Sequence, residues 1–155
     1  MRILVLSDSH RDAVSLYTAI EREPTAEVVY FLGDGCGEAS EAAARYIGKK
    51  QFICVKGNCD FCADVPEKDI RTLENTRIYA THGYAENVKF TYQNLYYAAK
   101  ENGCTLALFG HTHDPYLDYY DGIYLFNPGS LKSGEYGVVD LTEKGLICIN
   151  KKLIY

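Results

Sequence analysis

The sequence predicts a single α/β domain in which two sheets pack together with helices on the outside. Up to about residue 114, short apolar runs alternate with helix-like stretches, which is the order of βαβ units and a parallel sheet layer. Beyond that point, short strands are separated by Asp-Gly, Pro-Gly and Lys-Gly turns, which indicate antiparallel pairing. The 155 residues contain no linker or low-complexity tract, so residues 1–155 are expected to form one domain.

Five apolar runs in the first part of the chain each end at a polar residue beside glycine. They are RILVL (2–6), VVYFLGD (28–34), FICVKGN (52–58), RIYATHG (77–83) and TLALFGH (105–111). Nearly continuous apolar runs of this length are typical of strands that are buried on both faces. Because ligands of open α/β sheets bind beyond the carboxyl ends of the strands, we expect the polar residues at these ends to converge.

Helices are expected between these runs, and further strands after them. The helix-like stretches span 12–23, 38–50 and 86–103, and the last ends at Gly103, a typical C-terminal cap. The later strands are expected within 115–120, 122–130, 134–141 and 145–155. Asp121-Gly122 predicts a tight hairpin turn between the first two of them.

Charge and composition limit the classes of substrate and partner that the protein is expected to bind. A formal net charge of -5 disfavours long nucleic acids and acidic membrane surfaces, and therefore favours a small-molecule substrate. The apolar run after Met1 is too short for a signal peptide or a membrane span, so we expect a cytoplasmic protein with reduced cysteines. The 14 tyrosines suit either a nucleobase-stacking surface or a homo-oligomer interface, although sheet and core packing explains most of them.

The polar residues at the strand ends have side chains that bind metal ions. They comprise two carboxylates, four imidazoles and one amide, namely Asp8, His10, Asp34, Asn58, His82, His111 and His113. Any one of them alone is more often a turn residue, a helix cap or a packed histidine. Together they predict a metal centre, because the chain has four histidines and all four lie in these loops.

These residues form motifs that resemble the five ordered blocks of calcineurin-like metallophosphoesterases. The motifs are Asp8-x-His10, Gly33-Asp34, Gly57-Asn58-x-Asp60, His82-Gly83 and Gly110-His111-x-His113. The GNCD block, and the GHTH block followed by NPGS, resemble the small bacterial and archaeal phosphodiesterases of that superfamily. The resemblance runs from Asp8 to Ser130 and implies a four-layer α/β/β/α sandwich of two mixed sheets flanked by helices.

The resemblance also implies a division of the ligands between two ions. One ion would be held by Asp8, His10, Asp34 and His113, and the other by Asp34, Asn58, His82 and His111. Asp34 would bridge both ions. The residues expected to act in catalysis are Asp34, Asn58, His82 and His111.

The implied function is that of a dinuclear metal-dependent phosphodiesterase, a hydrolase of a small or nucleotide-like phosphodiester. A hydroxide bridging the two ions would attack the phosphorus. Mixed nitrogen and oxygen donors favour divalent transition metals, with manganese first and nickel, iron, zinc or cobalt as alternatives. Two divalent ions, two aspartates and one hydroxide leave roughly one positive charge, which suits a diester monoanion better than a monoester dianion.

Three positions remain ambiguous in the sequence. Many members of the superfamily have a histidine after the asparagine that is thought to protonate the leaving group, but this chain has Cys59, and a thiol is a poor general acid at neutral pH. Lys132, where close relatives often have an arginine, is either a phosphate contact or a surface lysine. Asp60 either orients a ligand or is only a turn residue.

Two other functions stay open at this point, a nuclease and a catalytically inactive scaffold or binding module, such as the retromer subunit of the same superfamily. The negative net charge argues against the nuclease. The complete set of ligand residues argues against the scaffold, because a scaffold can lose ligands without penalty.

Overall fold

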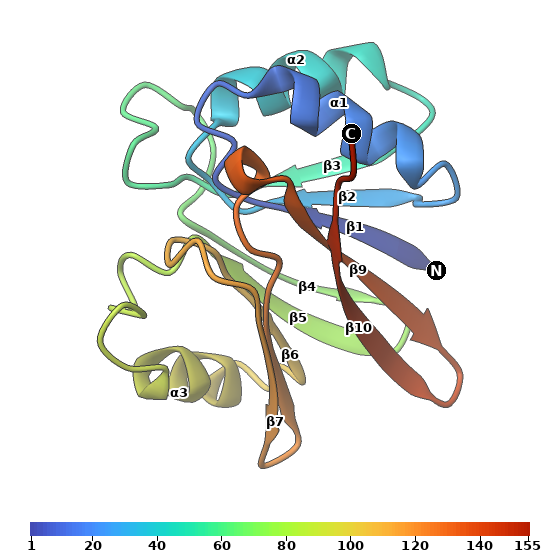
Figure 1. Cartoon of the computed structure of the whole chain (residues 1–155). Helices are drawn as coiled ribbons and strands as arrows, with labels where there is room; N and C mark the ends of the chain where they lie inside the picture. Colours follow the sequence, from blue (N-terminus) through green and yellow to red (C-terminus); the bar gives the residue numbers. More distant parts are fainter.

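The computed structural model describes residues 1–155 as two five-stranded sheets packed between helices (Figure 1). The helices are α1 (Ala13–Arg22), α2 (Cys36–Arg45) and α3 (Gln93–Glu101), with a 3-10 turn η1 (Leu131–Ser133). The strands are β1 (Arg2–Leu6), β2 (Val28–Phe31), β3 (Gln51–Cys54), β4 (Lys68–Leu73), β5 (Thr76–Thr81), β6 (Leu106–Leu108), β7 (Tyr116–Tyr120), β8 (Ile123–Asn127), β9 (Glu135–Thr142) and β10 (Gly145–Lys152).

Both sheets are mixed. The first has the order β10-β9-β1-β2-β3, in which β1, β2 and β3 are parallel while β9 runs antiparallel to β1 and β10. The second has the order β4-β5-β6-β8-β7, in which β5, β6 and β8 are parallel and the two edge strands are antiparallel to their neighbours. The sheets therefore do not divide at residue 115, because β5 and β6 belong to the second sheet and β9 and β10 return to the first.

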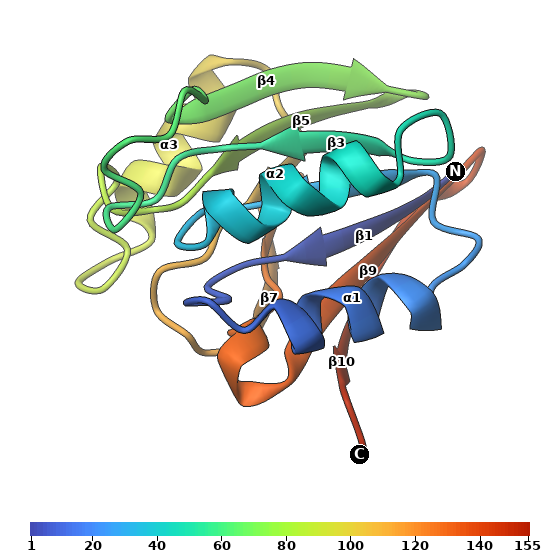
Figure 2. The same ribbon diagram turned by 90° about the horizontal axis from the view of Figure 1, so that it is seen from above.

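Three apolar cores separate four layers, which confirms the predicted α/β/β/α sandwich. One core lies between the first sheet and helices α1 and α2, which lie side by side on its outer face (Figure 2). A second core fills the space between the sheets, and a third lies under α3. Successive residues of β1 point alternately into the first two cores, Leu4 into one and Ile3 and Val5 into the other, and for this reason the strand is apolar throughout.

Two predicted helices are shorter than expected. Residues 84–90 form turns, with Asn87 at φ +60°, and α3 begins only at Gln93. The left-handed conformation of Asn87 is incompatible with a continuing right-handed helix. Helix α2 ends at Arg45, and the chain then turns through Gly48 at φ +76°.

The hairpin turn that the sequence predicts is present in the structure. Asp121 and Gly122 have φ values of +50° and +79°, so the predicted tight hairpin turn between β7 and β8 is confirmed as type I′. None of the helices is both long enough and apolar enough to cross a membrane.

Candidate metal centre

The predicted ligand residues lie in loops at one edge of the sandwich, where the carboxyl ends of five parallel strands meet. The loops after β1, β2 and β3 of the first sheet carry Asp8, His10, Asp34 and Asn58. The loops after β5 and β6 of the second sheet carry His82, His111 and His113. The candidate site therefore lies across the boundary between the two sheets.

One group of side chains consists of Asp8, His10 and His113. Nε2 of His113 lies 3.2 Å from Oδ1 of Asp8 and 3.2 Å from Nε2 of His10. The Asp8 side chain is fully buried, and its Oδ2 accepts hydrogen bonds from the Ser7 hydroxyl at 2.6 Å and the His111 backbone N–H at 3.1 Å. Oδ1 of Asp8 has no hydrogen-bond partner at all. A buried carboxylate oxygen without a partner is costly, and a cation at this position would supply the missing interaction.

A second group is formed by Asp34, His82 and His111. Nε2 of His82 lies 3.3 Å from Oδ2 of Asp34 and 3.2 Å from Nδ1 of His111. Nδ1 of His82 is 2.7 Å from the Leu32 carbonyl oxygen, which can only accept, so Nδ1 carries the proton. Nε2 therefore faces the site, which is how outer hydrogen-bond partners orient metal-binding histidines. Burial opposes a charge on His82, but the contact with Asp34 and the charge of Asp8 outweigh burial and raise its pKa, so a metal ion at Nε2 would displace a proton.

Asp34 connects the two groups. Its Oδ2 lies 3.3 Å from Nε2 of His82 and 3.8 Å from Nε2 of His10. Its Oδ1 accepts a hydrogen bond from the Cys59 backbone N–H at 2.8 Å, which fixes the orientation of the carboxylate. Asn58 is exposed, and its amide contacts the Cys59 sulfur at 3.6 Å, so this residue borders the two groups without joining them.

The electrostatics of the site favour the metal-binding protonation states of Asp34 and His111. Burial alone would raise the pKa of Asp34, but the contact with His82 and the Cys59 N–H outweigh burial and hold this pKa well below its ordinary value. Burial, together with the charges of His82 and Lys89, lowers the pKa of His111 to about 4. At neutral pH the Asp34 carboxylate is therefore anionic and the His111 imidazole neutral, as ligation requires.

The backbone of the ligand loops is strained. Five of the predicted ligands have left-handed φ values, namely Asp8 (+53°), His10 (+44°), Asp34 (+58°), His111 (+70°) and His113 (+64°). For a residue other than glycine this conformation costs about 1–2 kcal/mol. Strain of this kind persists only where the surrounding contacts hold it, and it is concentrated at functional sites.

Asp60 supplies some of those contacts. Its carboxylate accepts backbone N–H groups from Asp34 at 2.7 Å, Gly57 at 2.8 Å, and Gly35 and Cys36 at 3.0 Å each. Asp60 therefore holds the Asp34 loop against the Gly57 loop and is more than a turn residue. The two loops approach so closely that a Cβ on Gly57 would lie 2.2 Å from Oδ1 of Asp34.

Two further positioning residues come from the NPGS motif, whose role the sequence left unexplained. Nδ2 of Asn127 donates to the Gly110 carbonyl at 3.1 Å and to the Thr112 hydroxyl at 3.0 Å, so it holds the loop of the last two histidines. The Ser130 hydroxyl donates to the Asp8 carbonyl at 2.8 Å. Both residues are buried. The available signal in the sequence was a polar residue at the end of an apolar strand, followed by Pro-Gly.

The structure also places the two remaining ambiguous positions. The Cys59 sulfur is exposed and lies within 4.8 Å of a ring nitrogen of His10 and a carboxylate oxygen of Asp34. Burial and the nearby Asp34 charge raise the pKa of Cys59, so the thiol is protonated at neutral pH. The Lys132 backbone N–H donates to the Asp8 carbonyl at 3.3 Å, but its side chain is exposed, forms no hydrogen bond or ion pair, and borders a different hollow together with Asp12. This supports the interpretation as a surface lysine.

Known proteins are similar to this chain in sequence and architecture. Residues 1–144 match the family described as the calcineurin-like phosphoesterase superfamily domain. The "Probable metallophosphoesterase YsnB" of Bacillus subtilis is 36% identical over 132 residues, which cover 85% of this chain and 76% of that protein. Phosphodiesterase YfcE of Escherichia coli K12 is 31% identical over 122 residues, which cover 67% of this chain and 60% of that protein. The crystal structure of a predicted phosphoesterase from Streptococcus pneumoniae aligns with a TM-score of 0.76 at 27% identity and covers 97% of each chain. The present chain therefore belongs to the calcineurin-like phosphoesterase superfamily.

Proposed function

We propose that the protein is a dinuclear metal-dependent phosphodiesterase that hydrolyses a small or nucleotide-like phosphodiester. The observation that carries this proposal is the position of Asp34 Oδ2, which lies between one group of donors around His10 and another around His82. Two donor groups that share a carboxylate suit a pair of ions, and the unpaired Asp8 Oδ1 supports a cation in the first group.

The family resemblance supplies the full ligand sets, and the two observed groups, Asp8 with His10 and His113, and Asp34 with His82 and His111, support three members of each. One ion would be held by Asp8, His10, Asp34 and His113, and the other by Asp34, Asn58, His82 and His111. When bound, such ions stabilise charge on the phosphoryl oxygens and lower the pKa of an attacking water. The mixture of imidazole, carboxylate and amide donors fits manganese, iron, zinc, nickel or cobalt, and we take manganese as the first choice.

The contribution of the chain itself is to position these donors before the substrate arrives. The Leu32 carbonyl orients His82, the Cys59 N–H orients Asp34, and buried hydrogen bonds hold the loops. Donors that are already in place need not reorganise during the reaction, which is the main advantage of a preorganised site. No strong acid stands at Cys59, so we expect esters with good leaving groups to react faster.

Substrate charge distinguishes diesters from monoesters. With both aspartates anionic and two divalent ions bound, a diester monoanion balances the site more closely than a monoester dianion does. We therefore expect faster hydrolysis of bis(p-nitrophenyl) phosphate than of p-nitrophenyl phosphate by the manganese-loaded protein. Faster turnover of the monoester would contradict the preference for diesters.

Metal stoichiometry tests the dinuclear arrangement. We expect two manganese ions per chain by elemental analysis after equilibrium dialysis, about one in His113→Ala, and loss of both metal binding and hydrolysis in Asp34→Ala. The matched control is Lys132→Ala, an exposed site outside both groups, which is expected to keep two ions. A single ion in the unmodified protein would refute the dinuclear arrangement, and an unchanged rate in Asp34→Ala would refute the assigned active site.

One further assay, and the results of those above, address the alternatives. We expect no nicking of plasmid DNA in the presence of manganese, because the net charge of -5 opposes binding of a long polyanion. A scaffold without activity would show metal binding but no hydrolysis of any phosphoester.

A further inference from the structure

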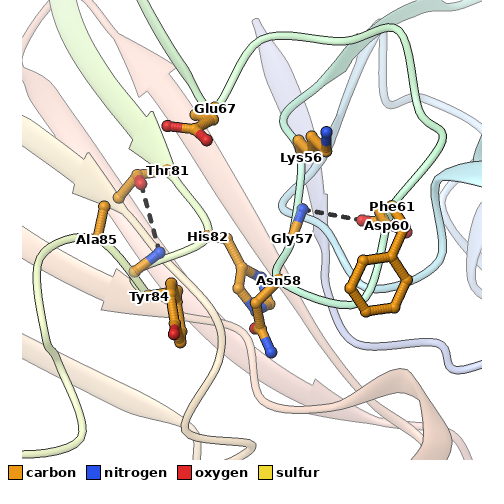
Figure 3. A pocket seen from close by; sticks show the side chains of 11 residues that line it. Lys56, Gly57, Asn58, Asp60, Phe61, Glu67, Thr81, His82, Tyr84 and Ala85 are labelled. Atoms are coloured by element: carbon orange, nitrogen blue, oxygen red, sulfur yellow. Dashed lines mark hydrogen bonds between the residues drawn. The ribbon is translucent and has the colours of Figure 1, made fainter.

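A hollow of about 350 Å³ adjoins the second donor group. Its walls come from the loops at residues 56–67 and 81–85, and the candidate ligands Asn58 and His82 border it. Figure 3 shows these two side chains between the aromatic rings of Tyr84 and Phe61. A substrate whose phosphate lies at the metal centre would extend one of its substituents into this space.

The two aromatic rings beside the hollow are unusually exposed. Phe61 is 84% exposed and Tyr84 is 63% exposed, although both border a cavity next to the candidate catalytic residues. The Tyr84 ring also packs edge-to-face with the His111 ring, at a centroid distance of 5.5 Å and an interplanar angle of 89°. Exposed aromatic side chains grouped around a hollow are typical of ligand sites, whereas isolated ones are ordinary surface residues.

The same hollow contains a cation and an anion that have no partner. Lys56 and Glu67 lie at the end of the hollow away from the Tyr84 hydroxyl and the Asn58 amide (Figure 3). Neither side chain forms an ion pair or a side-chain hydrogen bond within the chain. A hydrogen-bond donor and an acceptor thus border the same hollow as the two aromatic rings.

We propose that this hollow is a nucleobase subsite. A nucleobase is flat enough to lie against Phe61 or Tyr84, and it carries donors and acceptors side by side in the plane of its ring, which suit Glu67 and Lys56. An alkyl substituent would leave both charged groups unpaired. The inference rests on the proposed function only for the position of the phosphate, and it narrows the substrate to a phosphodiester with a nucleoside on one side.

Equilibrium binding tests the subsite independently of turnover. With manganese-loaded protein, we expect calorimetry to show that thymidine 5′-monophosphate binds about 5- to 150-fold more tightly than 2-deoxyribose 5-phosphate, the range for one stacked base. Phe61→Ala and Glu67→Ala are expected to remove most of this difference, and Phe61→Trp to retain it. The control Tyr97→Ala alters an aromatic side chain that is 55% exposed and lies on α3 away from the hollow, and it is expected to retain the difference.

Hydrolysis provides the second measurement. The ratio of kcat/KM for thymidine 5′-(p-nitrophenyl phosphate) to that for methyl p-nitrophenyl phosphate compares two diesters with the same leaving group. We expect this ratio to exceed ten in the unmodified protein and to fall toward one in Phe61→Ala, mainly through KM.

The outcomes separate the two proposals. Equal binding of the nucleotide and the sugar phosphate, or a preference that survives both Phe61→Ala and Glu67→Ala, overturns the subsite even if both esters are hydrolysed. A preference that depends on Phe61 without hydrolysis of either ester overturns the proposed function and leaves the nucleobase site standing.

Discussion

Replacing Asp60 with alanine removes a carboxylate that accepts four backbone N–H groups at 2.7–3.0 Å. Two of these groups belong to the loop of Asp34, one to the first turn of α2, and one to the loop that continues into Asn58. We therefore expect Asp60→Ala to weaken both the stability of the fold and the binding of metal ions.

The magnitude follows from the hydrogen bonds that are lost. A hydrogen bond to a charged group contributes about 1.5–3 kcal/mol, so four independent bonds would contribute about 6–12 kcal/mol. The four bonds share one carboxylate, and water can reach the vacated space because Asp60 is only half-buried. We therefore expect the free energy of unfolding of the metal-free protein to fall by about 3–5 kcal/mol.

The pH dependence provides a further check. Burial would raise the pKa of Asp60, but the N–H groups of Cys36, Gly57 and Asp34 outweigh it and lower this pKa. A carboxyl group whose pKa is lower in the folded state stabilises the fold fully above its unfolded value, about pH 4, and loses this effect as pH falls through the folded value. The difference in stability between the unmodified protein and Asp60→Ala is therefore expected to shrink below about pH 4.

Urea unfolding followed by circular dichroism, in the presence of a chelator, measures these differences. Asp64→Ala is the matched control, because Asp64 is exposed on the same loop and is expected to change the free energy of unfolding by less than about 0.5 kcal/mol. If Asp60→Ala is as stable as this control and binds manganese with unchanged affinity, Asp60 does not hold the ligand loops and our reasoning is wrong.

Three further predictions concern the site. Asp8→Asn is expected to stabilise the metal-free protein by about 1 kcal/mol, because an amide N–H can face Nε2 of His113, which lies 3.2 Å from the unpaired oxygen. The same variant is expected to lose manganese binding. A variant that is less stable than the unmodified metal-free protein in urea would contradict this. Gly110→Ala would place a Cβ 2.0 Å from the Ser7 hydroxyl and is expected to cost about 1–3 kcal/mol in thermal unfolding, whereas Gly37→Ala in open space on α2 should be neutral or stabilising. Cys59→His is expected to raise kcat for phenyl esters relative to p-nitrophenyl esters on the order of 10- to 100-fold, since an imidazole can protonate a poor leaving group; an unchanged ratio would place the proton donor elsewhere.

The sequence predicts that the ligand loops meet, because the apolar runs identify the buried parallel strands and the polar residues after them identify the ligands. Asp34 follows a strand buried on both faces, and parallel strands present their carboxyl ends at one edge. The hydrogen bonds that orient these residues were not predictable in the same way. The contact of Asn127 with Gly110 joins two loops 17 residues apart, and only the packed sheet brings them together. The identity of the bound ions and their number stay predictions.

The parts of the fold that the sequence did not predict lack a clear local pattern of hydrophobic residues or depend on contacts between distant residues. Strand β4 carries Asp69 and Arg71, which pair with each other at 2.6 Å, and its residues are exposed or half-buried, so neither continuous nor alternating hydrophobicity marks it. Val88 has the spacing of a helical core residue, but it is buried against Gly83 by a turn instead. The division of strands between sheets depends on pairing over long sequence separations, such as Ile3 with Val139, which no local pattern specifies.

Each proposed ion would take donors from both sheets, His113 with Asp8 on one side and His82 with Asp34 on the other. Bound metal would then cross-link the two layers at this edge, and the edge could open only after an ion dissociates. Amide hydrogen exchange in the ligand loops is therefore expected to slow on metal loading, while the turn between β9 and β10 at residues 142–145, at the opposite end of these strands, keeps its rate. Since proteases cleave opened segments, the lifetime of this protein in a cell would depend on the supply of metal as well as on its sequence.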